Sequence, residues 1–180
     1  MNAEARIAEL KLELPPAPKP VATYVPVVQV GNLVYVSGHG PLRPDKSLVT
    51  GVVGADLTEE QGYESARVTG LAVLATLRNY LGSLDRVVRL VKVLGMVNAA
   101  PNFERHPFVI NGFSDLMVEV FGEPGKGARS AVGMGSLPGR IATEVEAIFE
   151  VRDAKPVRPA RKTKKPAAKT VKRVAKKKRR

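Results

Sequence analysis

A run of apolar residues at positions 87–97 restricts the fold more than any other feature of the chain. It reads Val-Val-Arg-Leu-Val-Lys-Val-Leu-Gly-Met-Val, and its many β-branched residues indicate a β-strand. Successive side chains of a strand point to opposite faces, and the adjacent pairs Val87–Val88, Leu90–Val91 and Val93–Leu94 place apolar groups on both. The pattern therefore predicts a central strand of a sheet that is covered on its two faces.

Two amphipathic helices flank this strand in the sequence. Thr58 and Gln61 have the spacing of a capping box, which predicts a helix over 59–81, and Gly82 is a typical helix stop. Pro107 suits the first turn of a second helix. The apolar positions that give this second helix its buried face are Val109, Phe113, Leu116 and Val120.

Further β-rich runs occupy 24–30 and 33–37, joined by the hairpin signal Gly31-Asn32, and also 129–134 and 142–151. The order β-β-α-β-α-β-β predicts an α+β fold, a mixed-sheet α/β sandwich with two helices packed on one face of a mixed sheet. No remaining segment of this part of the chain is long enough to cover the other face. We therefore expect another subunit to cover it.

The chain divides into three parts by composition. Residues 1–20 predict a short N-terminal helix, capped by Asn2, and a proline-rich spacer, and residues 21–152 predict the compact domain. Residues 153–180 hold 14 Lys and Arg residues against one acid, whereas residues 1–152 carry a net charge of −1. The tail has too few apolar residues to fold alone, so we expect it to be disordered.

The positive charge of the tail is dense enough to bind polyanions by counterion release, and its Lys/Ala/Pro/Thr composition is similar to histone-H1-like tails. We expect non-specific binding to nucleic acid, because the tail has no aromatic residue on which bases could stack. A solubilising tail and a tail that binds anionic membrane surfaces are the alternatives. The cations assigned to this role are Lys164, Lys165, Lys169, Lys172, Arg173, Lys176, Lys177, Lys178, Arg179 and Arg180.

Composition excludes several kinds of site. The chain has no cysteine and two histidines, so disulfides, thiolate metal sites and a cysteine nucleophile are excluded, and we expect no metal and no cofactor. The glycine-rich segment 122–127 lacks the spacing of a phosphate loop. No apolar run approaches the roughly 18 residues of a membrane helix. We expect a cytoplasmic protein, with association with the nucleoid as an alternative if the tail binds DNA.

Two glutamates and one arginine are the strongest candidates for chemistry. Glu144 and Glu146 are two apart on a predicted strand, so their side chains share a face, and Arg129 is expected on the neighbouring strand. Together they would form a site for a charged substrate and a water molecule, although a solvated strand face gives the same pattern. His39 follows a strand and has the chemistry of a general base, but a turn histidine without a chemical role is the favoured interpretation.

Several segments resemble the Rid family, the reactive intermediate deaminases also called the YjgF family. Ala128-Arg129-Ser130-Ala131-Val132, then Leu137-Pro138, then the segment 143–148 resemble its C-terminal signature. The segment 31–38, Gly-Asn-Leu-Val-Tyr-Val-Ser-Gly, resembles its N-terminal hairpin, and Asn111 with Phe113 matches its second helix. These matches keep their order and spacing over residues 22–151.

The resemblance implies a chorismate-mutase-like fold, a homotrimer with clefts between subunits, and hydrolysis of reactive 2-imino or enamine acids to 2-keto acids and ammonia. It implies that Arg129 binds the carboxylate of a small substrate and that Glu144 holds the attacking water. The residues that it implies for the rest of the substrate site are Tyr24, Ser37, Gly38, Asn111, Ser130 and Ala131. Ala131, at a position where some members carry Cys, would act through its backbone.

Two other functions stay open at this point. One is a catalytically silent protein of the same fold that binds a carboxylate metabolite. The other is a nucleic-acid-associated protein or ribonuclease that acts through the tail, since some relatives have been described as endoribonucleases. Residues 1–152 carry a net charge of −1 and show no basic stripe of their own. This disfavours a nucleic-acid-binding surface on the domain itself.

Overall fold

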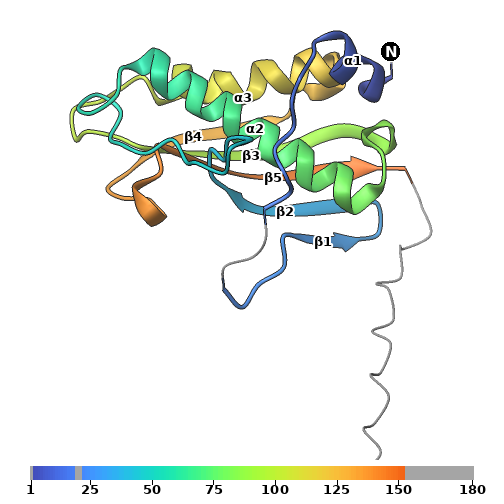
Figure 1. Ribbon diagram of the computed structural model, residues 1–180. Helices are drawn as coiled ribbons and strands as arrows, with labels where there is room; N and C mark the ends of the chain where they lie inside the picture. The colour runs from blue at the N-terminus through green and yellow to red at the C-terminus, as the bar shows by residue number, and fades with distance from the viewer. Residues whose placement is uncertain (1, 19–21, 153–180) are drawn as a thin grey trace, which may run out of the picture.

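The computed structural model describes residues 2–18 and 22–152, and the predictions for the basic tail lie outside these residues. One sheet of five strands forms the centre of the molecule (Figure 1). Its strands lie in the order β1 (Val27–Val30), β2 (Leu33–His39), β5 (Thr143–Val151), β3 (Val87–Asn98) and β4 (Ala128–Met134). β3 and β4 are parallel and the other neighbours antiparallel, which confirms a mixed sheet in an α+β fold.

Two long helices, α2 (Glu59–Leu81) and α3 (His106–Phe121), cover one face of the sheet. The predicted capping box is present at α2, where Thr58 Oγ1 accepts from the Gln61 amide at 3.3 Å and Gln61 Oε1 accepts from the Thr58 amide at 2.8 Å. Gly82 ends the helix with a φ of 81°, a left-handed conformation that favours glycine. Among residues 2–18 and 22–152, no helix is long and apolar enough to cross a bilayer.

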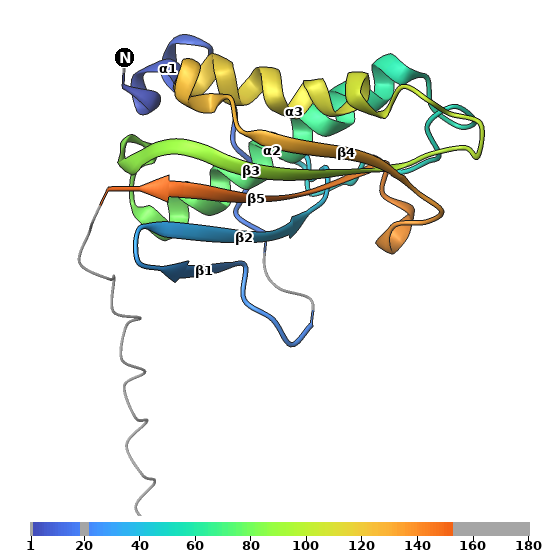
Figure 2. The same cartoon turned by 180° about the vertical axis from the view of Figure 1, so that it is seen from behind.

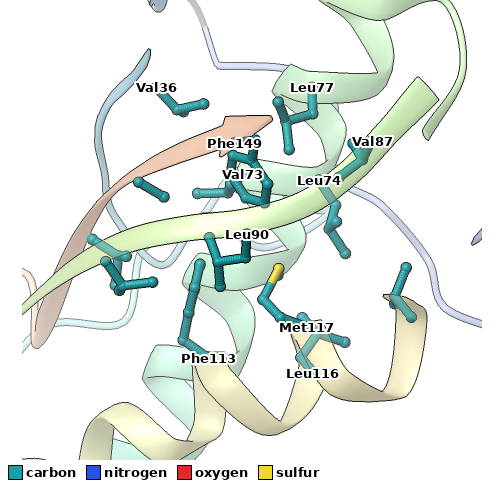
Figure 3. Close-up of a cluster of buried hydrophobic side chains, with 14 of the residues drawn as sticks. Val36, Val73, Leu74, Leu77, Val87, Leu90, Phe113, Leu116, Met117 and Phe149 are labelled. Atoms are coloured by element: carbon teal, nitrogen blue, oxygen red, sulfur yellow. The ribbon is translucent and has the colours of Figure 1, made fainter. Parts of the chain in front are cut away.

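The core lies between the two helices and the sheet, and Figure 3 shows its side chains pointing toward one another from α2, α3 and the strands. Val109, Phe113 and Leu116 of α3 are fully buried, and Val120 is 2% exposed, as the helical spacing predicts. On β3 the buried positions Val87, Leu90 and Val93 are three apart rather than two. Between 87 and 89, and again between 90 and 92, β3 has one residue more than β5, so β3 bulges at both places. These bulges, and not strict alternation alone, account for the adjacent apolar pairs in the sequence.

A short helix, α1 (Ala3–Glu9), precedes the spacer and packs beside α3 (Figure 1). Asn2 caps it as expected, accepting from the Ala5 amide at 3.2 Å. The helix does not continue into the spacer, because Lys11 has a φ of 51°, which breaks the helical conformation. Glu4 anchors α1 to the end of α2 by accepting from the Leu84 amide at 2.8 Å.

Within the described residues, 3₁₀ turns lie at Leu84–Arg86, Glu123–Gly125 and Pro138–Arg140. The second of them lies where a flexible glycine-rich loop is predicted, and its Gly125 is buried against the carbonyl of Met117. β1 begins at Val27 rather than at 24, because Pro26 has no N–H to donate to a strand. Neither difference moves the strands that carry the candidate residues.

The second face of the sheet carries no helix, and Figure 2 looks onto it. Val28 and Tyr35 are paired across β1 and β2 on this face and are 49% and 42% exposed. Ile148 of β5 is opposite Tyr35, and Leu94 and Met96 of β3 continue the apolar surface, all three of them half-buried. In the described part of one chain nothing covers this apolar face, as the sequence led us to expect.

Candidate functional site

The site begins at an irregularity in β2. Val36 is opposite Ala147 and His39 is opposite Val145, so β2 has one residue more than β5 over this interval. The extra residue forms a bulge at Ser37-Gly38, opposite Glu146. Bulges of this kind change the direction of a strand and re-aim its side chains, and here the bulge borders a cavity.

The cavity has a volume of about 1080 Å³ and opens at the edge of the uncovered face. Tyr24, Ser37, Gly38, Glu144 and Glu146 all line it. The structure therefore brings together five residues that the sequence singled out, from the segment before β1, from β2 and from the distant β5. The alternation of β5 places both glutamates on the cavity side and buries Val145 and Ala147 in the core, as predicted.

Glu144 lies directly against the backbone of Gly38. A Cβ atom at Gly38 would come within 2.1 Å of Glu144 Oε1, so the carboxylate occupies the space that a side chain there would fill. Burial raises the pKa of Glu144, and the neighbouring charge of Glu146 raises it further. A half-buried carboxyl with a raised pKa is suited to take a proton from water and to return it during a reaction.

Ser37 and Tyr24 form the wall of the cavity next to Glu144. The Ser37 hydroxyl donates to the carbonyl of Val25 at 2.8 Å, and the Ser37 amide donates to the carbonyl of Pro26 at 3.0 Å. These bonds hold the segment that carries Tyr24 against β2. The Tyr24 side chain is 46% exposed, so its ring is available to a ligand or to a second protein surface.

The expected position of Arg129 beside the glutamates is wrong for a single chain. Arg129 is on β4, and β3 lies between β4 and β5. Arg129 is opposite the buried Val93, so it also points to the helix side of the sheet, whereas Glu144 points to the uncovered side. Sequence order shows which strands follow one another, but it does not fix which strands are neighbours in the sheet.

Arg129 instead forms a second polar group with α3. Its Nη1 donates to Asn111 Oδ1 at 2.8 Å and to Ser114 Oγ at 3.0 Å, and its Nη2 donates to the carbonyl of Pro107 at 3.4 Å. The guanidinium is thereby fixed in orientation at the edge of the sheet, with a half-buried side chain. Asn111 was predicted to belong to the site, and the structure places it with Arg129 rather than with Glu144.

The two residues that follow Arg129 point in opposite directions. Ser130 is on the uncovered face, where its hydroxyl accepts from Lys92 Nζ at 3.0 Å. Ala131 is on the helix side, opposite Gly95 of β3. Ala131 and Arg129 therefore share a face, and Ser130 lies on the opposite, uncovered face of the sheet.

The two histidines have structural surroundings. His39 is a buried strand residue rather than a turn residue, with Nδ1 2.6 Å from the Ser37 carbonyl and Nε2 2.7 Å from Thr76 Oγ1. Burial lowers its pKa, so the neutral imidazole is favoured there. At the start of α3, Arg105 holds the N-cap position and the His106 ring packs edge-on against Phe103. Residues 2–18 and 22–152 contain no cluster of acidic or histidine side chains that could hold a metal ion.

Sequence reasoning missed one whole side of the cavity. Pro16 and Pro18 of the spacer, Leu42 and Leu48 of the loop after β2, and Ile141 also line it. Leu42 and Leu48 bridge one another across this loop, and Ile141 bridges Thr50. The signal was present as apolar residues in a segment rich in proline and glycine, a composition for which no buried role was expected.

Comparisons with known proteins identify the family to which the chain is similar. A sequence model of the family described as "YjgF/chorismate mutase-like, putative endoribonuclease" matches residues 4–142, and thus ends just before Glu144. Protein TCP17 of Trypanosoma cruzi is 41% identical over 150 residues, which cover 83% of this chain and 94% of that protein. A 2-iminobutanoate/2-iminopropanoate deaminase of Dermatophagoides farinae is 30% identical over 141 residues, covering 78% and 94%.

Solved structures share the fold. A protein of unknown function from Agrobacterium tumefaciens superimposes with a TM-score of 0.76 at 40% identity, covering 83% of this chain and 94% of that one. A protein of Shewanella oneidensis described as a "putative endoribonuclease" gives a TM-score of 0.81 at 30% identity, covering 84% and 100%. These likenesses confirm the chorismate-mutase-like fold that the sequence motifs implied.

Proposed function

The chain belongs to the YjgF/chorismate mutase-like family, the Rid family that its motifs resemble, and on that premise we propose that it hydrolyses 2-imino or enamine acids. The products would be a 2-keto acid and ammonia. The observation that carries the proposal is Glu144, a half-buried carboxyl held against Gly38 inside a cavity. The relative that is named as a 2-iminobutanoate/2-iminopropanoate deaminase supports the same reaction class.

The chemistry requires one water molecule and one group that moves protons. Glu144, as the carboxylate, accepts a proton while the water oxygen bonds to the electrophilic carbon of the C=N group. Starting from the protonated C=NH2+ group, this addition gives a carbinolamine, and Glu144 then returns the proton to its nitrogen. The C–N bond breaks and ammonia leaves as the carbonyl forms, while the Glu144 carboxylate accepts the hydroxyl proton and passes it to the released ammonia. The pKa of Glu144 is raised above that of an ordinary glutamate. A carboxyl with a pKa nearer to neutrality serves both as the base that takes the proton and as the acid that returns it.

Arg129 is the residue that we assign to the substrate carboxylate. A guanidinium held by Asn111 and Ser114 presents its remaining donors in a fixed plane, which matches the two oxygens of a carboxylate. Arg129 and Glu144 are on opposite faces of one chain, so we infer that a complete site takes Arg129 and Asn111 from one copy and Glu144 from another. The uncovered apolar face of the sheet supplies the surface for that association.

A complementation experiment tests the shared site. Arg129→Ala and Glu144→Gln are each expected to be inactive when purified alone, measured as ammonia release from 2-imino acids generated in solution. After unfolding and refolding as an equal mixture, about a quarter of the sites would draw an intact Arg129 and an intact Glu144 from different copies. Activity should then return to roughly that fraction of the wild-type value.

The control for this experiment is each variant refolded alone, which should stay inactive. An inactive mixture, formed from variants that assemble normally, would contradict the shared site. If the wild-type protein itself released no ammonia but bound 2-keto acids, the catalytically silent alternative would replace the deaminase.

We propose separately that residues 153–180 bind nucleic acid without sequence preference. The proposal is supported by 14 cationic residues against one acid in this segment, while residues 1–152 carry −1. The family and one solved relative are described as endoribonucleases, but the net charge of residues 1–152 gives no comparable support for a nucleic-acid surface on the domain. Contact with nucleic acid is therefore assigned to the tail, and hydrolysis to the cavity.

A further inference from the structure

We infer that the cavity beside Glu144 selects 2-imino acids with large apolar side chains, through an apolar wall built by the loop after β2 and the N-terminal spacer. This inference rests on the proposed function and names the substrate class for the same site. The reacting group alone would occupy a small part of a cavity of about 1080 Å³, since pockets for much larger ligands measure roughly 300–1,000 Å³.

The wall begins close to Glu144 and leads away from it. The carboxylate of Glu144 lies on Gly38, and a Cβ atom two residues further along, at Gly40, would come within 2.9 Å of Ile141 Cδ1. At the rise of a strand, two residues span about 7 Å. Apolar surface therefore starts one side-chain length from the carboxylate that would hold the water.

The loop after β2 continues this surface. Leu42 and Leu48 bridge each other across the loop, and both line the cavity. Leu48 is 44% exposed in one chain and lines the cavity. A ligand with an apolar side chain would cover exposed surface of this kind, and that burial is favourable.

The N-terminal spacer forms the opposite part of the wall. Pro16 and Pro18 line the same cavity, although they are more than 120 residues away from Glu144 in the sequence. α1 fixes the start of the spacer through the contacts of Glu4 with Leu84 and Arg78. Prolines have a restricted φ, so this part of the wall loses little conformational freedom when a ligand binds.

The inference is tested with paired substrates. 2-Imino acids generated from phenylalanine and leucine, and 2-iminopropanoate generated from alanine, are compared by kcat/KM in the full-length protein. Because one buried methylene changes kcat/KM by on the order of tenfold, the two large substrates should exceed 2-iminopropanoate by at least about tenfold. Leu48→Ala should lower kcat/KM for the large substrates by about fivefold to tenfold and leave 2-iminopropanoate within about twofold.

Val88→Ala is the matched control, since Val88 is a 39% exposed valine on β3 that does not line the cavity. This variant should leave kcat/KM for both the large and the small substrates unchanged. Equal kcat/KM for small and large substrates, or a preference for the acidic side chain of 2-iminoglutarate through Lys46, would overturn the inference while leaving the proposed function intact.

Failure of the proposed function has a different signature, namely no hydrolysis of any of these substrates. Binding then decides the inference by itself, with phenylpyruvate and pyruvate as probes in calorimetry. Binding of phenylpyruvate at least about tenfold tighter than pyruvate, weakened by Leu48→Ala, would support the apolar wall in a protein without catalysis. Equal binding of the two 2-keto acids would overturn it.

Discussion

At the scale of single residues, Glu144 shows how the fold prepares one group for chemistry at a cost in stability. Thr143 and Val145 on either side of it are fully buried, so the strand cannot turn to bring the Glu144 carboxylate fully into water. Gly38 supplies the space that the carboxylate occupies. Burial and Glu146 both disfavour the charged form, which is why the pKa of Glu144 is raised.

Glu144→Gln is expected to increase stability and to remove activity. A carboxyl whose pKa is raised on folding contributes stability below the ordinary glutamate pKa, and that contribution is lost as pH rises through the raised value. At pH near 7 the variant should therefore have the higher free energy of unfolding, and the difference should disappear below about pH 4. Hydrolysis should fall by about 10²-fold to 10⁴-fold.

Glu146→Gln is the matched control for this prediction. It removes the charge that helps to raise the pKa of Glu144, so the acid limb of kcat/KM should move to lower pH while activity near neutrality is retained. Urea unfolding at several pH values and pH–rate profiles check the two variants. A Glu144→Gln protein that is less stable than wild type at neutral pH would contradict the assigned surroundings of the carboxyl.

At the scale of elements, close contact between α2 and α3 sets the helical layer that buries the core and orients Arg129. A Cβ atom at Gly112 of α3 would come within 1.9 Å of the Tyr63 carbonyl oxygen of α2. Gly70 of α2 faces Leu116 and Phe113 of α3, so this glycine allows close contact between the two helices. Asn111, next to Gly112, then meets Arg129 from a fixed direction.

Gly112→Ala should destabilise the protein, because the added methyl group would meet backbone atoms that no rotamer change can move. The loss from overpacking is about 1–3 kcal/mol, partly offset by the better helix propensity of alanine. Gly135→Ala is the control, since a Cβ atom there has no neighbour within 4 Å. Thermal unfolding compares the two, and equal midpoints would show that the helices are not in the contact described.

At the scale of the whole molecule, the face of the sheet without helices and the two separated groups of site residues lead to the same conclusion. Val28 and Tyr35 leave apolar surface exposed on that face, and Arg129 cannot reach Glu144 within one chain. The association of copies through this face that we propose would account for both observations. Contiguous apolar patches on the surface of a folded domain mark interaction sites.

We therefore predict a homotrimer that forms with or without the tail. Light scattering of residues 1–180 and of residues 1–152 should give three chains per particle in both cases. Tyr35→Lys places a charge in the middle of the exposed apolar face and should dissociate the trimer and reduce hydrolysis together. A monomeric wild-type protein that hydrolyses imines would contradict both the interface and the shared site.

The charge of the tail leads to a prediction about salt. Binding to duplex DNA should fall by about 0.9 log units per phosphate contacted for each log unit of salt. With roughly six to ten phosphates engaged, affinity should drop on the order of a thousandfold or more between about 50 and about 200 mM salt. Residues 1–152 should not bind but should keep hydrolytic activity, and tight binding by this truncated chain would move the nucleic-acid surface to the domain.

The sequence by itself determined most of the elements and the facing of side chains where strands and helices are regular, because both depend on neighbours within a few residues. The capping box at Thr58, the stop at Gly82 and the shared face of Glu144 and Glu146 follow from local spacing, and the structure has all three. The family motifs added the chorismate-mutase-like fold. The same resemblance assigned Tyr24, Ser37 and Gly38 to the substrate site, and these residues line the cavity with Glu144.

Only the tertiary structure decided which elements became neighbours. β3 separates β4 from β5, so Arg129 is apart from Glu144, and strand order depends on the packing of the whole sheet rather than on sequence distance. The bulge at Ser37-Gly38 and the apolar wall of Leu42, Leu48 and the spacer arise in the same way. Contacts between distant segments depend on shape and packing over the entire chain, and no local pattern of residues records them.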